Sequence, residues 1–427
     1  MSHVGIVGAG WAGLAAAIHA TRRGHRVTLW EATRGVGGRA RSQQSKDPNA
    51  PALDNGQHLL MGAYTEVRDL MATVGADAQR LLRDSPLDLR WPQGQGLALP
   101  VRLSRWPAAA QLANTLVRAS GWSWRDRWQL ARWSLRWRGR SCPPSACVAD
   151  LCEGLSATVM RQLITPLCVS ALNLPPAHAS GELFLTVLRD TLWASPQHWR
   201  AWIPRAPLGE LFPEPALAWL RAQGADIHLG ERVQSLLLTP HGLRVQAAVD
   251  VDHLILATAA PHAAALARQL PHAQAQSWAD AAEGLSHTAI ATAYARAPGL
   301  RLPRPMLALE TQHDFDAQFV FDLGQLGRPT GCLAAVLSHA PEHSDGLQAH
   351  LTQQLRTALG DVSLEITQLV LEKRATFAAK PGVDRPSPVV CPKVWACGDH
   401  VSGPYPATLE GAVRSARALP WSDLAAP

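Results

Sequence analysis

The first thirty-one residues combine apolar runs with a glycine-rich turn in a pattern typical of a β-α-β unit. An apolar run at residues 4–7 is followed by glycines in the order G-x-G-x-x-G, namely Gly8, Gly10 and Gly13. A second apolar run at residues 27–30 ends at Glu31. Two short apolar runs separated by a helix-length segment predict two parallel strands, joined by a helix that begins near Trp11.

Each glycine of this motif has a separate physical role. One permits the tight turn from strand to helix, one lets the backbone approach a pyrophosphate, and one lets the helix lie close to the sheet. The diphosphate of a dinucleotide would then lie at the positive end of the helix dipole. Glu31 stands where a carboxylate accepts hydrogen bonds from a ribose diol, and its charge would repel a 2′-phosphate. The motif therefore predicts a site for FAD or NAD and disfavours NADP.

A second glycine-rich turn follows the β-α-β unit directly. It contains Gly35, Gly37, Gly38, Arg39 and Arg41. Small residues let the backbone lie against a cofactor, and a guanidinium can pair with its phosphates. The segment resembles the glycine-arginine turn of the flavin-containing amine oxidase and phytoene desaturase superfamily, which runs beside FAD. This resemblance favours FAD over NAD and implies that Gly38 and Arg39 contact the cofactor.

The carboxyl end of the chain carries a second motif that resembles the same superfamily. An apolar run at residues 394–397 ends at Gly398 and Asp399, and a helix opened by small residues follows at 403–416. In the superfamily the aspartate binds the ribityl or phosphate region of FAD, and the helix amino terminus points at the isoalloxazine. The resemblance implies cofactor contacts for Gly398 and Asp399, and for Thr408 and Leu409 where the helix starts.

Between the two motifs, we expect a flavin domain that is interrupted by a substrate domain. Short strands are expected at 227–229, 233–238, 243–248 and 254–257, then further strands at 293–374 with one helix at about 346–359. The resemblance implies that Val233 lends backbone hydrogen bonds to adenine. The predicted fold class is α/β, amine oxidase and phytoene desaturase-like. Residues 1–85, 205–260 and 385–427 would form the Rossmann-like FAD-binding domain, and residues 86–204 and 261–384 a discontinuous α+β substrate domain.

Residues 91–140 are rich in tryptophan and arginine, with seven of the sixteen tryptophans of the chain. At helical spacing, one stripe is formed by Trp124, Trp128, Ala131 and Leu135, and it is broadened by Leu130, Trp133 and Trp137. Arg125, Arg132 and Arg136 fall largely off this stripe. Such a face suits a membrane interface, with indoles at headgroup depth and arginines on phosphates. It equally suits a helix that packs tryptophans into the core of the substrate domain, and both interpretations stay open.

Length and charge narrow the class of protein. The chain has 427 residues, of which 47% are hydrophobic and 17% charged, so it is long enough for two domains with a large core. Its formal charge of +6 includes no basic run like a nucleic-acid-binding arm, so we expect no nucleic acid and favour a membrane surface as the anionic partner. Seven cysteines without a C-x-x-C pair predict reduced thiols and no metal site.

The sequence also indicates a location in the cell. It enters its first apolar run at Val4, which leaves no room for a signal peptide, and no apolar run is long enough to cross a bilayer. We therefore expect a cytoplasmic protein, peripheral at the inner face of the cytoplasmic membrane where it contacts lipid. The sequence gives no expectation for the oligomeric state.

Two polar residues that follow the dinucleotide-binding β-α-β unit are candidates for catalysis. Gln57 and His58 follow the turn-forming residues 54–56 and precede a run of small residues. In the superfamily this segment passes near the flavin ring, so either side chain would face the reacting centre. The alternative is a polar turn with a surface histidine, because only geometry places an acid or a base.

The resemblance extends to a narrower family. Several internal segments are similar to the squalene-associated FAD-dependent desaturases of bacterial hopanoid gene clusters, the hydroxysqualene dehydroxylases: residues 54–58, 163–168, 171–173, 207–220, 372–377 and 397–399. This implies reductive removal of an allylic hydroxyl from hydroxysqualene to give squalene, with NAD(P)H as the electron donor. The flavin would carry the hydride transfer, and the protein would exclude water and supply a proton, for which His58 is the nominee.

Three other functions fit the same motifs. A carotenoid-type desaturase or isomerase would use the same fold for a polyene, with the flavin as oxidant. An amine oxidase needs paired aromatic side chains over the flavin, and of the three tyrosines only Tyr405 is well placed. A non-catalytic prenyl-lipid carrier on the same fold would lack flavin.

Overall fold

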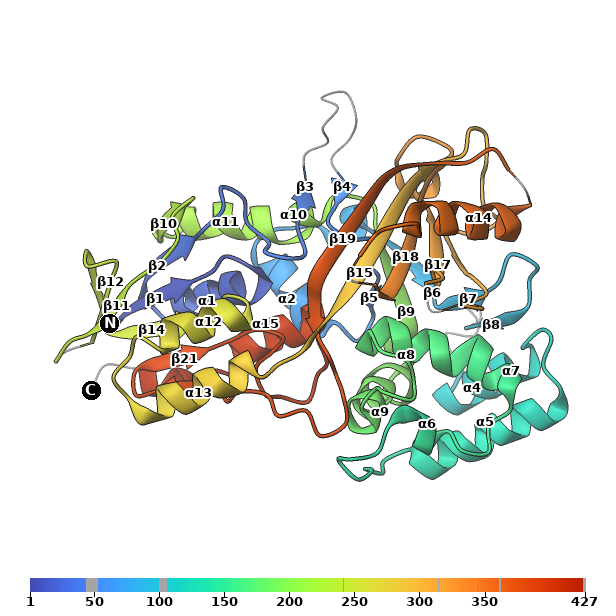
Figure 1. Ribbon diagram of the computed structural model, residues 1–427, viewed down its shortest axis with the longest axis horizontal. Helices are drawn as coiled ribbons and strands as arrows, with labels where there is room; N and C mark the ends of the chain where they lie inside the picture. The colour runs from blue at the N-terminus through green and yellow to red at the C-terminus, as the bar shows by residue number, and fades with distance from the viewer. Residues whose placement is uncertain are drawn as a thin grey trace.

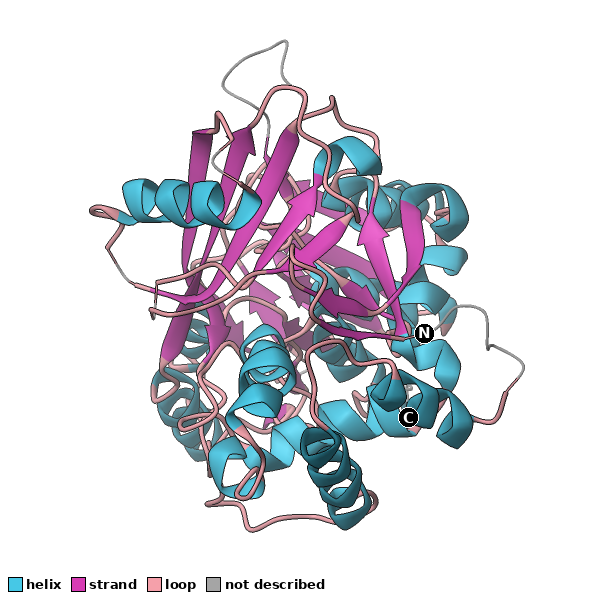
Figure 2. Ribbon diagram, turned by 90° about the vertical axis from the view of Figure 1, so that its right-hand side faces the viewer, coloured by secondary structure: helices cyan, strands magenta, loops and turns pink. Residues whose placement is uncertain are grey.

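The computed structural model describes residues 1–43, 53–99, 106–240, 242–313, 315–341, 343–360 and 362–424. Two large sheets organise the chain, one six-stranded and one five-stranded (Figure 1). Figure 2 shows the strands in the interior of the view, with helices around and below them. The six-stranded sheet is mainly parallel and confirms the predicted α/β fold class.

The six-stranded sheet is assembled from three distant parts of the sequence. Its strands, in spatial order, are β10 (Asp226–Leu229), β2 (Arg26–Glu31), β1 (His3–Val7), β14 (His253–Leu256), β21 (Val394–Ala396) and β20 (Val389–Cys391). All neighbours are parallel except β20, which runs antiparallel to β21. The carboxyl ends of the central strands therefore meet at one edge, where an open α/β sheet binds its ligand.

Helices cover both faces of this sheet because successive strand side chains point to opposite sides. Val4 and Ile6 of β1 belong to one hydrophobic cluster and Val7 to another. The first cluster includes α1 (Trp11–Arg22), α2 (Thr65–Thr73), α11 (Pro213–Ala222) and α15 (Leu409–Arg417). The second includes α12 (Ala260–Ala267), α13 (Ala273–Glu283) and the sheet of β11 (Leu236–Leu238), β12 (Leu243–Val245) and β13 (Val249–Val251).

Helices α12 and α13 share a core with the six-stranded sheet, and the domain bounds stay a prediction. One detail differs from the sequence prediction. Val233 lies outside any strand, because β11 begins only at Leu236, although its side chain is buried. A strand prediction over 233–238 was therefore too long at its amino end.

The five-stranded sheet is antiparallel and carries the second half of the molecule. Its strands, in spatial order, are β16 (Met306–Ala308), β17 (Phe319–Asp322), β18 (Cys332–Ala340), β15 (His287–Arg296) and β19 (Glu365–Phe377). Small side chains on one face, such as Ala291 and Ala293 of β15, pack against Leu351 of α14 (Leu347–Leu359). The helix predicted at 346–359 is thereby confirmed. The other face, with Tyr294, Phe319 and Phe321, shares a hydrophobic core with the helices between residues 108 and 199, called the helical group below.

A group of helices lies below this sheet, at the end of the molecule away from the six-stranded sheet (Figure 1). It consists of α4 (Ala108–Val117), α5 (Trp124–Trp137), α6 (Val148–Leu151), α7 (Ala157–Val159), η1 (Met160–Ile164), α8 (Thr165–Leu172), α9 (Gly181–Leu188), η2 (Arg189–Trp193) and η3 (Pro196–Trp199). Shorter elements join the two halves: α3 (Ala78–Leu81), α10 (Leu208–Leu211), η4 (Leu323–Leu326) and the strands β3 (Ser42–Gln43), β4 (Leu53–Asp54), β5 (Leu60–Met61), β6 (Leu82–Pro86), β7 (Asp88–Arg90), β8 (Gly96–Ala98) and β9 (Arg200–Pro204).

Asn173 fastens the helical group to the five-stranded sheet. It ends α8 in a left-handed conformation with a φ of 54°, which asparagine tolerates better than most residues. Its side-chain amide donates to Thr288 Oγ1 at 2.6 Å, and its Oδ1 accepts from the backbone N–H of His339 at 2.7 Å. Because Asn173 is buried, these bonds compensate for its desolvation and fix the helical group over the sheet.

Candidate functional site

The first glycine motif forms a turn with no room for side chains at two of its three positions. Gly8 has a φ of 107°, and a Cβ there would lie 2.8 Å from the carbonyl oxygen of Ala257. A Cβ at Gly13 would lie 1.9 Å from the carbonyl oxygen of Gly8. These two glycines therefore let the first turn of α1 lie directly on β1 and β14.

Gly10 has the opposite surroundings. A Cβ there would meet only the Cα of Gly38, at 3.8 Å, so the backbone faces open space. Gly10 also begins α1, and this helix end has neither a side-chain cap nor an acidic residue in its first turn. An uncapped amino terminus exposes N–H donors beside that space, which is the arrangement that binds a diphosphate.

Glu31 lies at the end of β2 beside this turn. Its Oε2 accepts from the backbone N–H of Ala9 at 2.8 Å, and its Oε1 accepts from the backbone N–H and the hydroxyl of Thr33, each at 2.9 Å. A carboxylate has about four acceptor positions, so capacity remains for a ribose hydroxyl. Val233, which is expected near adenine, has backbone N–H and C=O groups without a hydrogen-bond partner in the described part of the chain.

The two sequence motifs meet in the structure. Gly10 pairs with Gly37 through an isolated bridge, which brings the second glycine turn onto the first. The next residues then reach the carboxyl end of the chain, because the Arg39 guanidinium forms an ion pair with Asp399 and donates to the carbonyl of Ala375 at 2.7 Å. Burial alone would raise the pKa of Asp399, but Arg39 and His400 hold that pKa well below its usual value. Asp399 is therefore ionised at neutral pH.

A cavity of about 190 Å³ opens at this ion pair. Its lining combines the start of α12 and the residue before it with β15 and β19 of the five-stranded sheet, the second glycine turn and the Gly-Asp motif: Arg39, Ala259, Ala260, Pro261, His262, His287, Glu372, Arg374, Phe377, Asp399 and His400. Two buried polar atoms at or beside this lining have no partner in the described part of the chain, Nε2 of His400 and Oγ1 of Thr258. Unpaired buried polar atoms indicate a ligand or water that completes them.

The residues present fit an FAD on these observations. Glu31 at the end of β2, the open space beside Gly10 after β1 and the cavity at Asp399 after β21 all lie at the carboxyl edge of the six-stranded sheet, where α1 begins without a cap. Glu31 and Val233 would hold the adenosine, Gly10 and Arg39 the diphosphate, and Asp399 the ribityl chain. No group of histidine, cysteine or acidic residues with metal-binding geometry occurs in the described ranges.

The helix after the second motif is fixed by its own contacts. Thr408 caps α15, because its Oγ1 accepts from the backbone N–H of Gly411 at 3.0 Å. The buried Glu410 accepts from the backbone N–H groups of Glu66 and Val67 at the start of α2, each at 3.0 Å. The predicted contacts of Thr408 and Leu409 with the isoalloxazine stay a prediction, since neither residue lines the larger cavity.

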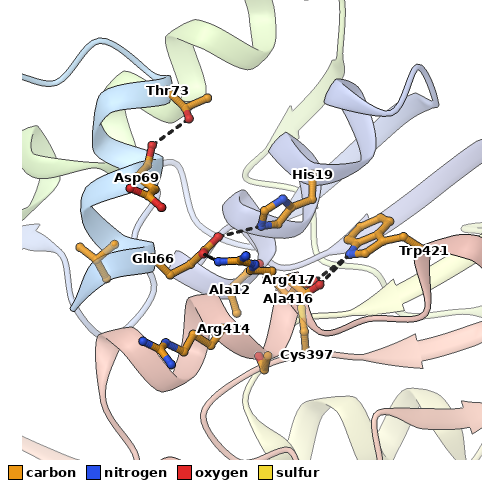
Figure 3. A network of polar contacts seen from close by, with 12 residues as sticks. Ala12, His19, Glu66, Asp69, Thr73, Cys397, Arg414, Ala416, Arg417 and Trp421 are labelled. Atoms are coloured by element: carbon orange, nitrogen blue, oxygen red, sulfur yellow. Dashed lines mark hydrogen bonds and ion pairs between the residues drawn. The ribbon is translucent and has the colours of Figure 1, made fainter. Parts of the chain in front are cut away.

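Figure 3 shows a polar network that ties this helix to α1 and α2. Glu66 lies between His19 at 3.2 Å and Arg417, so one carboxylate joins three helices. Although burial would raise it, the pKa of Glu66 lies below its usual value because the His19 ring lies beside the carboxylate and Arg417 donates a hydrogen bond to it. The network holds the carboxyl-terminal helix in place behind the glycine turn.

The two candidate catalytic residues lie apart from the larger cavity. Gln57 lines a separate cavity of about 20 Å³ beside Asp54 and Tyr294. His58 lines neither cavity, and its Nδ1 lies 2.7 Å from the carbonyl oxygen of Gly56, to which it donates. Burial lowers the pKa of His58, so the ring is neutral at neutral pH with Nε2 as an acceptor. A catalytic part for either residue stays a prediction.

Sequence reasoning missed several residues of the site. His262, His287 and His400 line the larger cavity, and only His400 could have been found, since it follows the Gly-Asp motif directly. A second missed contact joins the helical group to the flavin domain, because the Tyr405 hydroxyl donates to the carboxylate of Asp190 in the π-helix η2. No local sequence pattern marks Asp190.

Known proteins match both the sequence and the fold. The sequence profile of the flavin containing amine oxidoreductases matches residues 11–418. The hydroxysqualene dehydroxylase of Rhodopseudomonas palustris is 29% identical over 96% of this chain and 96% of that protein, and that of Sinorhizobium fredii is 28% identical over 97% and 96%. The zeta-carotene desaturase of Zea mays is 32% identical, but over only 22% of this chain and 18% of that protein. An oxidoreductase structure from Methanosarcina mazei aligns with a TM-score of 0.75 over 98% of this chain and 99% of that one, at 16% identity, which shows the fold alone.

Proposed function

Because this chain belongs to the flavin containing amine oxidoreductase family, we propose that it is an FAD-dependent hydroxysqualene dehydroxylase. The observation that carries the proposal is the similarity to two hydroxysqualene dehydroxylases, which covers 96% of the length of each of those proteins. Similarity to a carotenoid desaturase covers less than a quarter of the chain and supports the shared flavin domain more than a shared substrate.

The proposed reaction replaces the C–O bond of an allylic hydroxyl by a C–H bond, giving squalene and water. It consumes one hydride and one proton. Reduced flavin, when bound, supplies the hydride, and NAD(P)H is the proposed source of the electrons. The chain itself must hold the isoprenoid, keep water away from the electron-poor carbon and deliver the proton to the departing oxygen.

We place the isoprenoid between the five-stranded sheet and the helical group. Tyr294, Phe319 and Phe321 of the sheet share an apolar core there with Trp199 and Leu163. Such surroundings suit a long hydrocarbon and exclude water. Phe377 of the same core also lines the cavity at Arg39 and Asp399, whose charges would orient the cofactor.

His58 is our proposed proton donor, and its surroundings make a definite pH prediction. Its pKa is lowered by burial, so only a minor protonated fraction exists at neutral pH. A rate that depends on protonated His58 is high below that pKa and falls as the pH rises through it. His58→Gln should keep FAD bound and lower kcat by about 100-fold or more. An unchanged kcat and an unchanged pH profile would remove His58 from the mechanism.

Peripheral contact with the cytoplasmic face of the membrane belongs to the same proposal, since a triterpene-sized hydrocarbon dissolves in lipid. In the described ranges no helix is long and apolar enough to cross a membrane, so any contact of those helices with lipid is made from the surface.

The proposal is tested by anaerobic incubation of the purified protein with FAD, NADPH and hydroxysqualene, with the products identified by mass spectrometry. Squalene formed in proportion to NADPH consumed is the expected result. Dithionite in place of NADPH separates the choice of electron donor from the reaction itself. Reduction of bound flavin by phytoene without NADPH would instead indicate a desaturase, and a colourless protein that binds isoprenoid would indicate a carrier.

A further inference from the structure

Helix α5 has two opposite faces with different surroundings. At 3.6 residues per turn, Trp124, Trp128 and Leu135 lie within about 40° of one another around the helix axis. Leu130 and Trp133 lie on the opposite side and are 7% exposed each. The apolar side chains of the helix therefore do not form the single broad stripe that the sequence suggested, because the tryptophans are divided between core and surface.

The inward face is firmly attached to the helical group. The indole N–H groups of Trp133 and Trp137 both donate to the carbonyl of Leu151, at 2.7 and 3.0 Å. Ser123 and Asp126 form a capping box that fixes the first turn. The outward residues of α5 therefore cannot turn inward without breaking these bonds.

The outward face is strongly apolar and exposed. Trp124, Trp128 and Leu135 are 72%, 70% and 74% exposed, and only Met1 among the large hydrophobic residues in the described ranges is as open to solvent. Arg127 donates to the carbonyls of Leu116 and Ala119, so the end of α4 with its exposed Val117 lies beside the first turn of α5. An apolar patch of this kind on a folded protein marks an interaction site.

The segment that carries this face is strongly positive. Residues 106–140 contain seven arginines and one carboxylate, that of Asp126, which leaves a formal excess of six positive charges, as large as that of the whole chain. Asp126 is buried in the capping box. The exposed arginines of the segment, namely Arg118, Arg125, Arg132, Arg136, Arg138 and Arg140, form no ion pair within the described part of the chain.

We infer that Trp124, Trp128 and Leu135 enter the headgroup region of an anionic phospholipid bilayer, with Arg125, Arg132 and Arg136 on lipid phosphates. This tryptophan-arginine face rests on the proposed function, since it would bring the helical group to the membrane in which the isoprenoid dissolves. Indole rings are favoured at headgroup depth, and unpaired arginines beside them match the negative surface of the lipid.

The same charges disfavour a second copy of this chain as the partner. A symmetric dimer through α5 would place the tryptophan-arginine face of one copy against the identical face of the other. The unpaired arginines would then repel one another in a partly desolvated interface. An anionic bilayer satisfies both the indoles and the guanidinium groups, whereas a second copy satisfies only the indoles.

The test is flotation of the FAD-loaded protein with vesicles of phosphatidylcholine alone and of phosphatidylcholine with phosphatidylglycerol. We expect flotation with the anionic vesicles that decreases as salt is raised. The triple variant Arg125→Glu, Arg132→Glu and Arg136→Glu should bind at least about a hundredfold more weakly, because each arginine near such a surface contributes about fivefold. The alanine variant, which combines Trp124→Ala, Trp128→Ala and Leu135→Ala, keeps the charge of the parent protein. It should still bind the anionic vesicles at least roughly tenfold more weakly, because it loses apolar contact with the lipid.

The matched control carries Leu237→Ala and Arg301→Glu, two exposed residues outside the helical group, and should float like the parent protein. Unchanged flotation of both triple variants would overturn the inference. So would a dimer in light scattering that the alanine variant converts to monomer, without flotation of the parent protein.

Turnover separates this inference from the proposed function. With hydroxysqualene dissolved in detergent, the alanine variant should work at the parent rate and keep its flavin, and with substrate in anionic vesicles it should be slower. Flotation without any turnover would refute the function and leave the surface standing. Turnover in detergent and in vesicles that is equal for parent and variant would refute the surface and leave the function standing.

Discussion

Helices α1 and α5 have similar lengths, 12 and 14 residues, but they differ in how much of their surface is buried. Ten residues of α1 are buried, and its small side chains let other elements approach from all sides. Only three residues of α5 are buried, and its large side chains project from the surface. Tertiary packing on every side holds α1, whereas one stripe of core contacts and a capping box hold α5.

The amino-terminal ends of the two helices differ in a way that separates function from stability. Ser123 and Asp126 satisfy the first N–H groups of α5 within the chain. α1 begins at Gly10 without any side-chain cap. A cap contributes about 1 kcal/mol, so leaving it out at a buried helix end is unfavourable unless a ligand supplies the acceptors. The absent cap of α1 thus agrees with a diphosphate site.

The largest effect is expected for Gly13→Ala in α1. The new Cβ would lie 1.9 Å from the carbonyl oxygen of Gly8, so the helix must move away from the sheet. We expect a loss of at least about 3 kcal/mol of folding free energy, together with the flavin. Thermal unfolding and the flavin absorbance of the purified protein measure both.

Gly10→Val is the matched control for that variant. The space beside Gly10 contains only the Cα of Gly38 within 4 Å, so the fold should survive while the side chain fills the expected pyrophosphate position. The protein should be folded and colourless. A yellow Gly10→Val protein at full occupancy would contradict the assignment of this end of α1 to the diphosphate.

A smaller but still large effect is expected for Trp133→Ala on the buried face of α5. The variant removes a side chain that is 7% exposed and the hydrogen bond to the carbonyl of Leu151. Substitutions of this kind cost about 3–5 kcal/mol. Chemical denaturation monitored by far-UV circular dichroism gives the value, and a loss below 1 kcal/mol would show that the helical group hardly depends on α5.

The capping box of α5 predicts a pH dependence. Hydrogen bonds from Ser156 and Ser123 hold the pKa of Asp126 below its usual value. A carboxyl whose folded pKa is depressed stabilises the fold above its unfolded pKa of about 3.9, and that stability is lost as the pH falls through the folded value. Ser123→Ala should cost about 1 kcal/mol at pH 7. The difference between parent and variant should shrink in strong acid, and a constant difference would contradict the role of Asp126.

These two helices also show what the sequence could predict. The end of α1 was predictable, because Gly8, Gly10 and Gly13 act within one turn and their spacing alone specifies the geometry. The Gly-Asp motif was predictable for the same local reason. Its ion pair with Arg39 joins residues 360 positions apart, so each partner could be nominated while the pair itself required the fold.

The division of α5 was not predictable, because its two faces are both apolar. Trp128 and Trp133 differ in burial only because the Leu151 carbonyl and the rest of the helical core lie on one side. Periodicity identifies a helix and its stripes, but not which stripe meets a partner. Similarly, His262 and His287 meet at the cavity only through the packing of α12 on one sheet and β15 in the other.

The smallest effect on stability is expected for Trp128→Ala, five residues before Trp133 on the same helix. Its indole is 70% exposed, so its removal should change the free energy of unfolding by less than about 0.5 kcal/mol. If it also lowers binding to anionic vesicles, the indole is retained for an external partner and not for the fold. A loss of stability close to that of Trp133→Ala would mean that the outward stripe packs within the protein in solution, and the contrast between the two faces would fail.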